Sequence, residues 1–177
     1  MLYKGSAPAS EPEVAALKKL LEGLYGTYSV ETSTPAPKDR NGTYIHLHSY
    51  SNLVLYPYGF DNSAKVPNSD ALRAGAFRQS HGNDYATGAP GDVLYNASGG
   101  DFDWVYRKLG VPGYVYEIGT GEEGGFFPGF QRADNYWKKV GPASASLPRP
   151  RTSRTPPRSA EPSPSSRLNV RTTVRSP

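Results

Sequence analysis

Residues 44–51 read YIHLHSYS, and residues 53–59, which follow them, read LVLYPYG. Apolar and aromatic side chains dominate both runs and a short polar segment separates them, which predicts strands at about 43–48 and 53–57. His48 ends the first strand. A histidine at the end of a buried strand is well placed to face a cleft, where its imidazole can bind a metal without disturbing the core. The alternative is a hydrogen-bonded histidine with no function at a strand end.

The rest of the first 142 residues alternates between helix and strand signals. Ser10 and Glu13 have the spacing of a capping box before an apolar pattern of helical period that ends at Gly26. Further helices are predicted near 69–80, 101–109 and 131–139, a strand at 114–118, and loops at 31–42 and 82–92. This alternation predicts an α/β fold with helices on the faces of a sheet.

The charge of the chain is unevenly distributed. The net charge of +4 divides into −2 for residues 1–142 and +6 for residues 143–177, which carry seven arginines and Glu161. Seven prolines, eight serines and no aromatic residue in 143–177 predict a disordered tail. Such a tail could bind polyanions through its arginines, but it lacks the aromatics that stack on bases, so nucleic acid is not the expected partner.

The composition excludes several classes of protein. There is no cysteine, so neither a disulfide framework nor a Cys-based metal or redox site is possible. No segment has the length or apolar character of a membrane span, and the N-terminal residues lack the apolar run of a signal peptide. We therefore expect no membrane association.

Two later segments extend the pattern around His48. Residues 94–104 read LYNASGGDFDW, and residues 114–117 read YVYE. With the opening residues 3–14 and the 44–59 stretch, they resemble, in order and spacing, the zinc metallocarboxypeptidases of the carboxypeptidase A/B type. The resemblance covers about residues 3–142 and corresponds to the second half of that catalytic domain. It implies a partial three-layer α/β/α sandwich with a mixed sheet.

The resemblance assigns roles to the residues of these motifs. It implies that His48 is a zinc ligand and that Glu117 takes a proton from zinc-bound water and passes it to the leaving amine. The remaining matches are substrate-binding residues: Ser49 and Tyr50 beside the substrate backbone, Tyr95 closing over the substrate, and Phe102 at the floor of the side-chain pocket. The implied reaction removes the C-terminal residue of a peptide or protein, with an apolar or aromatic preference because Phe102 stands where basic-specific relatives carry an acid. Asp101, one residue away, complicates that preference.

Several features depart from the family pattern. The family's other zinc ligands form a His-x-x-Glu pair, and none of the three histidines here begins one. The family's substrate-binding arginines from the first half have no counterpart, and Ile118-Gly119-Thr120 replaces a segment that usually contains another arginine. His46 shares a face with His48 by strand alternation, so a His-x-His pair could chelate a metal without an upstream partner. His81 is expected to be an exposed loop residue.

Three interpretations therefore remain open. The chain is part of a zinc carboxypeptidase, a degenerate copy without activity, or an inert globule with a basic interaction tail. Relatives of this type are mostly secreted, which implies an extracellular location, although the sequence shows no signal peptide.

Overall fold

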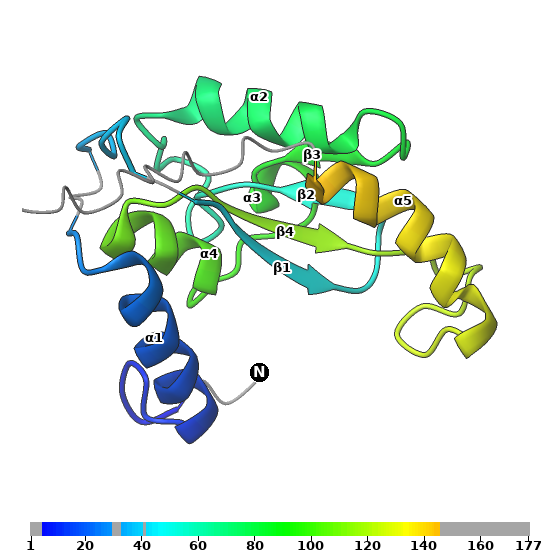
Figure 1. Cartoon of the computed structure of the whole chain (residues 1–177), viewed down its shortest axis with the longest axis horizontal. Coiled ribbons are helices and arrows are strands. Elements are labelled where there is room, and N and C mark those ends of the chain that lie inside the picture. The colour runs from blue at the N-terminus through cyan, green and yellow to red at the C-terminus, as the bar shows by residue number, and fades with distance from the viewer. Residues whose placement is uncertain (1–4, 30–32, 41, 146–177) are drawn as a thin grey trace, which may run out of the picture.

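The computed structural model describes residues 5–29, 33–40 and 42–145. Its centre is a four-stranded sheet in the order β1-β4-β2-β3 (Figure 1). The strands are β1 (Tyr44–His48), β2 (Leu53–Leu55), β3 (Ala86–Gly88) and β4 (Gly113–Glu117). β1 pairs with β4 and β2 with β3 in parallel, whereas β2 and β4 are antiparallel. The predicted α/β fold with a mixed sheet is confirmed.

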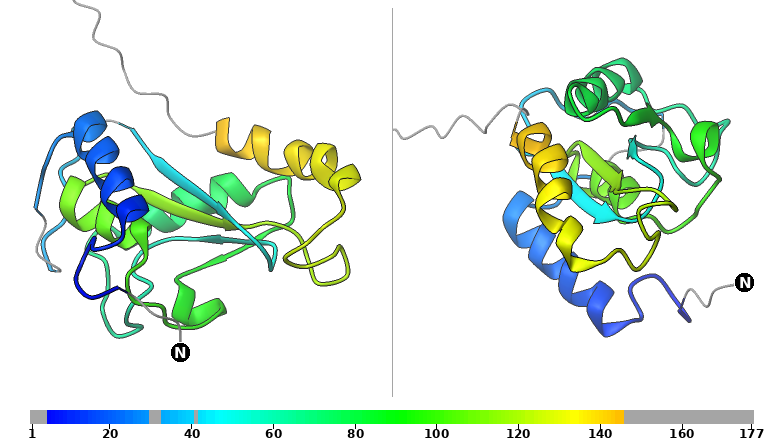
Figure 2. Two further views of the ribbon diagram at one scale, coloured as in Figure 1. Left: turned by 90° about the horizontal axis from the view of Figure 1, so that it is seen from below. Right: turned by 90° about the vertical axis from the view of Figure 1, so that its right-hand side faces the viewer.

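Helices cover both faces of this sheet. The helix α2 (Ser69–Ser80) contacts β2, β3 and the helix α5 (Ala133–Ala145). The helix α4 (Asp101–Trp104) contacts β1 and β4 and continues as the π-helical turn η1 (Val105–Leu109), which packs against α1 (Pro12–Tyr25). Figures 1 and 2 show α2 and α1 on opposite sides of the sheet. Two short elements complete the fold, α3 (Pro90–Val93) and the 3-10 turn η2 (Phe130–Arg132).

The alternation of side chains along β4 builds two different cores. Tyr114 and Tyr116 point toward α2 and α5 and belong to the largest apolar cluster. Tyr116 is fully buried, and its hydroxyl donates to Gln79 Oε1 at 2.9 Å. On the opposite face Val115 packs with Leu53, Leu55 and Phe102 of α4. Glu117, two residues after Val115, lies on this second face, where β4 ends.

The start of α1 differs from the predicted capping box. Glu11, rather than Ser10, is the N-cap residue, and no side chain caps the helix. Ser10 Oγ instead donates to Glu11 Oε1 at 3.0 Å, one residue before the helix, and Pro12 occupies the first helical position. The capping prediction is therefore wrong, whereas the helix itself is confirmed.

Only one residue of the apolar stripe on α1 is buried. Leu21 is 4% exposed and packs on Val105, Leu109 and Val111, whereas Leu20 and Leu24 are 57% and 66% exposed. Within the described ranges, no helix is long and apolar enough to cross a membrane.

The segment 82–92, predicted to be a loop, contains β3 and α3. The prediction is wrong because β3 is only three residues long and gains its conformation from pairing with β2, which no local pattern shows. The strand after residue 53 ends at Leu55, two residues before its predicted end.

The helix α5 passes the predicted domain boundary at residue 142. It continues through Pro142 to Ala145, because Val140 and Ala143 are buried in the main core. For residues 143–145 the expectation of a disordered tail is therefore wrong. The remainder of that expectation concerns residues 146–177, which lie outside the described part of the chain.

Candidate active site

His48 and Glu117 lie side by side where two parallel strands end. They are direct register partners in the β1–β4 pair, so their side chains lie on the same face of the sheet. The amide of Ile118 donates to the carbonyl of His48 at 2.8 Å and holds the two strand ends together. The carboxyl ends of strands in α/β sheets are where ligands bind. The sheet therefore brings together the two residues that the sequence separates by 69 positions.

Burial changes the acidity of the Glu117 carboxyl. The residue is half-buried at the strand end, and this burial raises its pKa above the ordinary value, while the nearby His48 opposes the rise. A carboxylate with a raised pKa holds a proton more readily after accepting one. This is the property that a general base needs when it must later act as an acid.

Ser49 and Tyr50 follow β1 directly and are joined by a cis peptide bond. The Tyr50 ring packs edge-on against Phe126 with ring centroids 5.0 Å apart. It also covers Gly125, where an added Cβ would lie 3.2 Å from the ring. Tyr50 therefore contacts the loop that follows Glu117, and the two segments together form one wall beside the strand ends.

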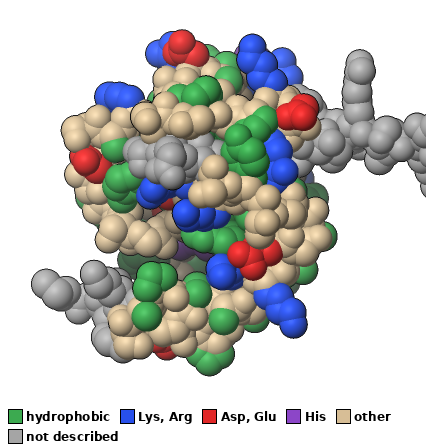
Figure 3. Space-filling model, turned by 90° about the vertical axis from the view of Figure 1, so that its left-hand side faces the viewer, with side chains coloured by type: hydrophobic (Ala, Val, Ile, Leu, Met, Phe, Trp, Pro, Cys, Tyr) green, Lys and Arg blue, Asp and Glu red, His purple; other side chains and the backbone are tan. Residues whose placement is uncertain are grey.

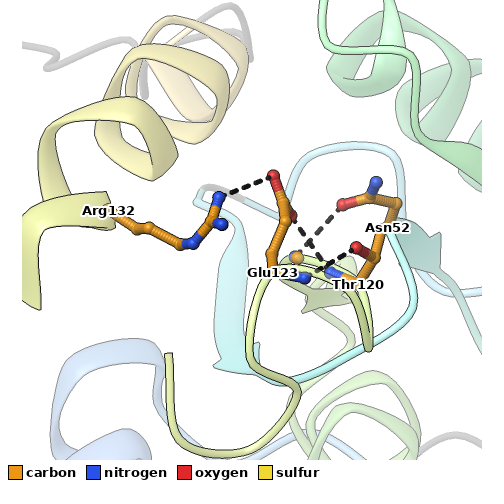
Figure 4. A network of polar contacts seen from close by, with 5 residues as sticks. Asn52, Thr120, Glu123 and Arg132 are labelled. Atoms are coloured by element: carbon orange, nitrogen blue, oxygen red, sulfur yellow. Dashed lines mark hydrogen bonds and ion pairs between the residues drawn. The ribbon is translucent and has the colours of Figure 1, made fainter. Parts of the chain in front are cut away.

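A polar network fixes the first turn of that loop (Figure 4). Asn52 Oδ1 accepts from the Gly119 amide at 3.1 Å, and Glu123 Oε2 accepts from the Thr120 amide at 3.1 Å. Arg132 Nη1 lies 3.8 Å from Glu123 Oε1. The segment after Glu117 that departs from the family sequence is therefore held by its own contacts. Asn52 was not predicted as part of this site. Its backbone has a positive φ of 52°, a conformation that asparagine tolerates better than most residues.

Tyr95 and Phe102 lie in contrasting environments. Tyr95 is 65% exposed on the segment after α3, whereas Phe102 is 6% exposed and belongs to the core between α4 and the sheet. The Phe102 ring lies so close to Gly59 that a Cβ there would be 2.8 Å from it. An exposed tyrosine suits a closing role, whereas the Phe102 ring is packed inside the core. Their roles toward a substrate remain predictions.

A cluster that the sequence analysis did not predict surrounds Asp101. Its Oδ2 accepts from the Tyr44 hydroxyl at 2.6 Å and lies 2.5 Å from His46 Nδ1. The His46 ring in turn meets the His48 ring edge-on, with centroids 4.3 Å apart. Burial and the Asp101 carboxylate raise the pKa of the Tyr44 hydroxyl. The residues come from positions 44–48 and 101, so only the folded chain shows their proximity.

The part of the chain that the structure describes contains no group of three or more His, Cys, Asp or Glu side chains that could hold a metal. Within these described residues His48 therefore belongs to no assembled three-ligand set, and its role as a zinc ligand stays a prediction. His81 is exposed just after α2, as expected.

A cavity of about 170 Å³ lies away from His48 and Glu117, between the segment after β2 and the start of α2. Figure 3 shows histidine side chains recessed in a hollow of one face, beside basic side chains.

Comparison with known proteins identifies the family. The zinc carboxypeptidase family model matches residues 1–142, and the chain belongs to this family. Rat carboxypeptidase B is 31% identical over 132 residues, which cover 71% of this chain and 28% of that protein. Bovine carboxypeptidase O is 28% identical over 124 residues, which cover 67% of this chain and 29% of the relative. The chain thus spans less than a third of the length of these relatives.

Solved structures confirm the fold. Bovine thrombin-activatable fibrinolysis inhibitor, in complex with tick carboxypeptidase inhibitor, superposes with a TM-score of 0.67 at 23% identity. The match covers 81% of this chain and 46% of that one. The carboxypeptidase A of Helicoverpa armigera gives a TM-score of 0.56 at 20% identity, covering 81% of this chain and 36% of that one. These likenesses establish the architecture alone.

Proposed function

We propose that this chain is the second half of a metallocarboxypeptidase catalytic domain and supplies His48 and Glu117 to its active site. Within a complete domain, that site hydrolyses the last peptide bond of a peptide or protein. The observation that carries the proposal is the register pairing of these two residues at the ends of β1 and β4. The family membership of residues 1–142 supports the same reaction.

Each side chain has a role that its position permits. When bound, a zinc ion in such a site polarises the scissile carbonyl and lowers the pKa of water. His48 contributes one imidazole to hold that ion. Glu117 takes the proton from the attacking water, and its raised pKa allows it to hold that proton until the leaving amine accepts it. Ser49 and Tyr50 orient the substrate backbone along the wall beside the strand ends.

The substrate preference rests on the resemblance at Phe102. An apolar residue stands there instead of the acid of basic-specific relatives, which favours an apolar or aromatic C-terminal side chain, and the residue is buried with Leu53 and Leu55. Tyr95, exposed to solvent, closes over the bound residue. The partner is therefore the C-terminus of a peptide or protein, and we expect the encounter to occur outside the cell, as in secreted members of this type.

The experiment that tests the proposal places these residues in a complete domain. In a chimera, residues 1–142 replace the matching segment of mouse carboxypeptidase A2, which is 31% identical over 136 residues. We expect the chimera to release C-terminal phenylalanine from a short peptide faster than C-terminal lysine. Glu117→Gln should lower kcat by at least about 100-fold, because a proton acceptor of this kind contributes about 10²–10⁴.

Glu122→Gln is the matched control, since this exposed carboxylate lies five residues further along the loop and should leave kcat unchanged. Circular dichroism and zinc content identify chimeras that fold and bind metal. A folded, zinc-containing chimera that keeps its kcat after Glu117→Gln would contradict the role of Glu117. One with no hydrolysis at all would favour the degenerate, non-catalytic copy.

A further inference from the structure

His46 and His48 lie on the same face of β1, close enough to act as a pair. Their ring centroids are 4.3 Å apart with planes at 76°. Both rings reach solvent, since the His46 side chain is 38% exposed and His48 is exposed. We propose that these two imidazoles form a zinc-chelating pair in which His46 is a metal ligand alongside His48. The proposal goes beyond the proposed function and does not depend on hydrolysis.

Asp101 determines which nitrogen of His46 is free. Its Oδ2 lies 2.5 Å from Nδ1, which is completely buried. The contact is short, although its angle is not that of an aligned hydrogen bond. A carboxylate can only accept, so Nδ1 faces Asp101 with its N–H and Nε2 is the ring nitrogen left for a metal.

No hydrogen bond or ion pair among the described residues uses the His46 Nε2 atom, so a ligand would not have to displace one there. A carboxylate on one imidazole nitrogen and a metal on the other is the usual arrangement of a metal-binding histidine. The Tyr44 hydroxyl, which donates to the same Asp101 oxygen at 2.6 Å, holds the carboxylate in place.

The geometry of the strand explains why two imidazoles suffice for measurable binding. Once one ring holds the ion, the second binds it intramolecularly, at a high effective concentration. Imidazole nitrogens suit zinc, and water fills the remaining positions. Glu117, the register partner of His48, lies at the same end of the sheet without forming a three-ligand group with the two histidines. Its carboxylate makes this end more favourable for a cation than for an anion.

The test uses the 177-residue chain and zinc chloride, with a chromophoric chelator as competitor. We expect one zinc ion to bind, with affinity at least about tenfold lower in His46→Ser and in His48→Ser. Asp101→Asn should weaken binding by about 10- to 100-fold, the usual effect of removing such a partner from a ligating histidine. His81→Ser removes an exposed histidine outside the pair and should leave the affinity unchanged. Circular dichroism of each variant checks that it folds.

A second measurement needs no substitution. Long-range ¹H–¹⁵N spectra of the wild-type imidazoles should show His46 protonated on Nδ1, and zinc should shift its Nε2 resonance together with one nitrogen of His48. Zinc affinity unchanged in His46→Ser, or a zinc titration that leaves His46 Nε2 unmoved, would overturn the proposal. If the chimera is inactive but zinc binding to the 177-residue chain depends on His46, only the proposed function is refuted. If the chimera is active but zinc binding does not depend on His46, only the proposed chelating pair is refuted.

Discussion

Asp103 provides a stability test that depends on the observed packing. This residue is 5% exposed at the start of α4, and both carboxyl oxygens lie 3.0 Å from the Gly59 amide. Burial raises its pKa to about 6, although the amides of Gly59 and Phe60 and the charge of Arg107 oppose the rise. In the unfolded chain the pKa is about 3.9. Between these values the folded chain binds more protons than the unfolded chain, so stability falls as the pH rises.

The magnitude follows from the two pKa values. Their separation corresponds to about 3 kcal/mol of unfolding free energy in total, of which about 2 kcal/mol is lost between pH 4.5 and pH 7.5. Asp103→Asn removes the titration and should flatten this part of the pH profile by about that amount. The stability of the Asp103→Asn variant at a single pH is less informative. The asparagine side chain has one acceptor oxygen for the two backbone amides of Gly59 and Phe60, so the substitution also changes their hydrogen bonds.

Urea unfolding followed by tryptophan fluorescence, at several pH values in this range, measures the profile. The raised pKa of Glu117 also makes stability fall as the pH rises. Glu117 is present in both the wild type and Asp103→Asn, so the difference between their two pH profiles isolates the contribution of Asp103. Profiles of wild type and Asp103→Asn that run parallel from pH 4.5 to 7.5 would refute the reasoning.

Three further predictions concern packing and catalysis. Leu21→Ala should cost about 2–5 kcal/mol in urea unfolding, whereas Leu24→Ala on the exposed side of α1 should cost less than about 0.5 kcal/mol; equal losses would contradict the packing of α1. Tyr116→Phe leaves Gln79 Oε1 without its donor and should cost about 1–3 kcal/mol, against no change for the exposed Tyr95→Phe, so a neutral Tyr116→Phe would count against that bond. The 177-residue chain with zinc should release no C-terminal phenylalanine, because two imidazoles fall short of the three ligands of a catalytic site; turnover abolished by Glu117→Gln would disprove this.

The sequence predicted that His48 and Glu117 each end an apolar strand, and the resemblance implied that they share a site. The register that pairs them is a property of the folded sheet. The sequence showed equally that His46 and His48 share a face. It did not show Asp101 against His46, since that contact joins segments 55 residues apart and depends on where α4 docks on the sheet. β3 escaped prediction for a related reason. Its three residues carry no period of their own, and the ladder with β2 determines their conformation.

The π-helical form of η1 was not foreseeable either. The sequence predicted one helix over 101–109, and the structure shows the α-helical turn Asp101–Trp104 widening into Val105–Leu109. Val105 and Leu109 are fully buried against α1, so tertiary packing accompanies the change in helix type.

The zinc content of the chimera and its His48→Asn variant tests the central claim most directly. If His48 belongs to a carboxypeptidase metal site, the dialysed chimera retains one zinc ion per molecule, His48→Asn loses most of it, and the control His81→Asn retains it. Full zinc retention by a folded His48→Asn chimera would contradict the account.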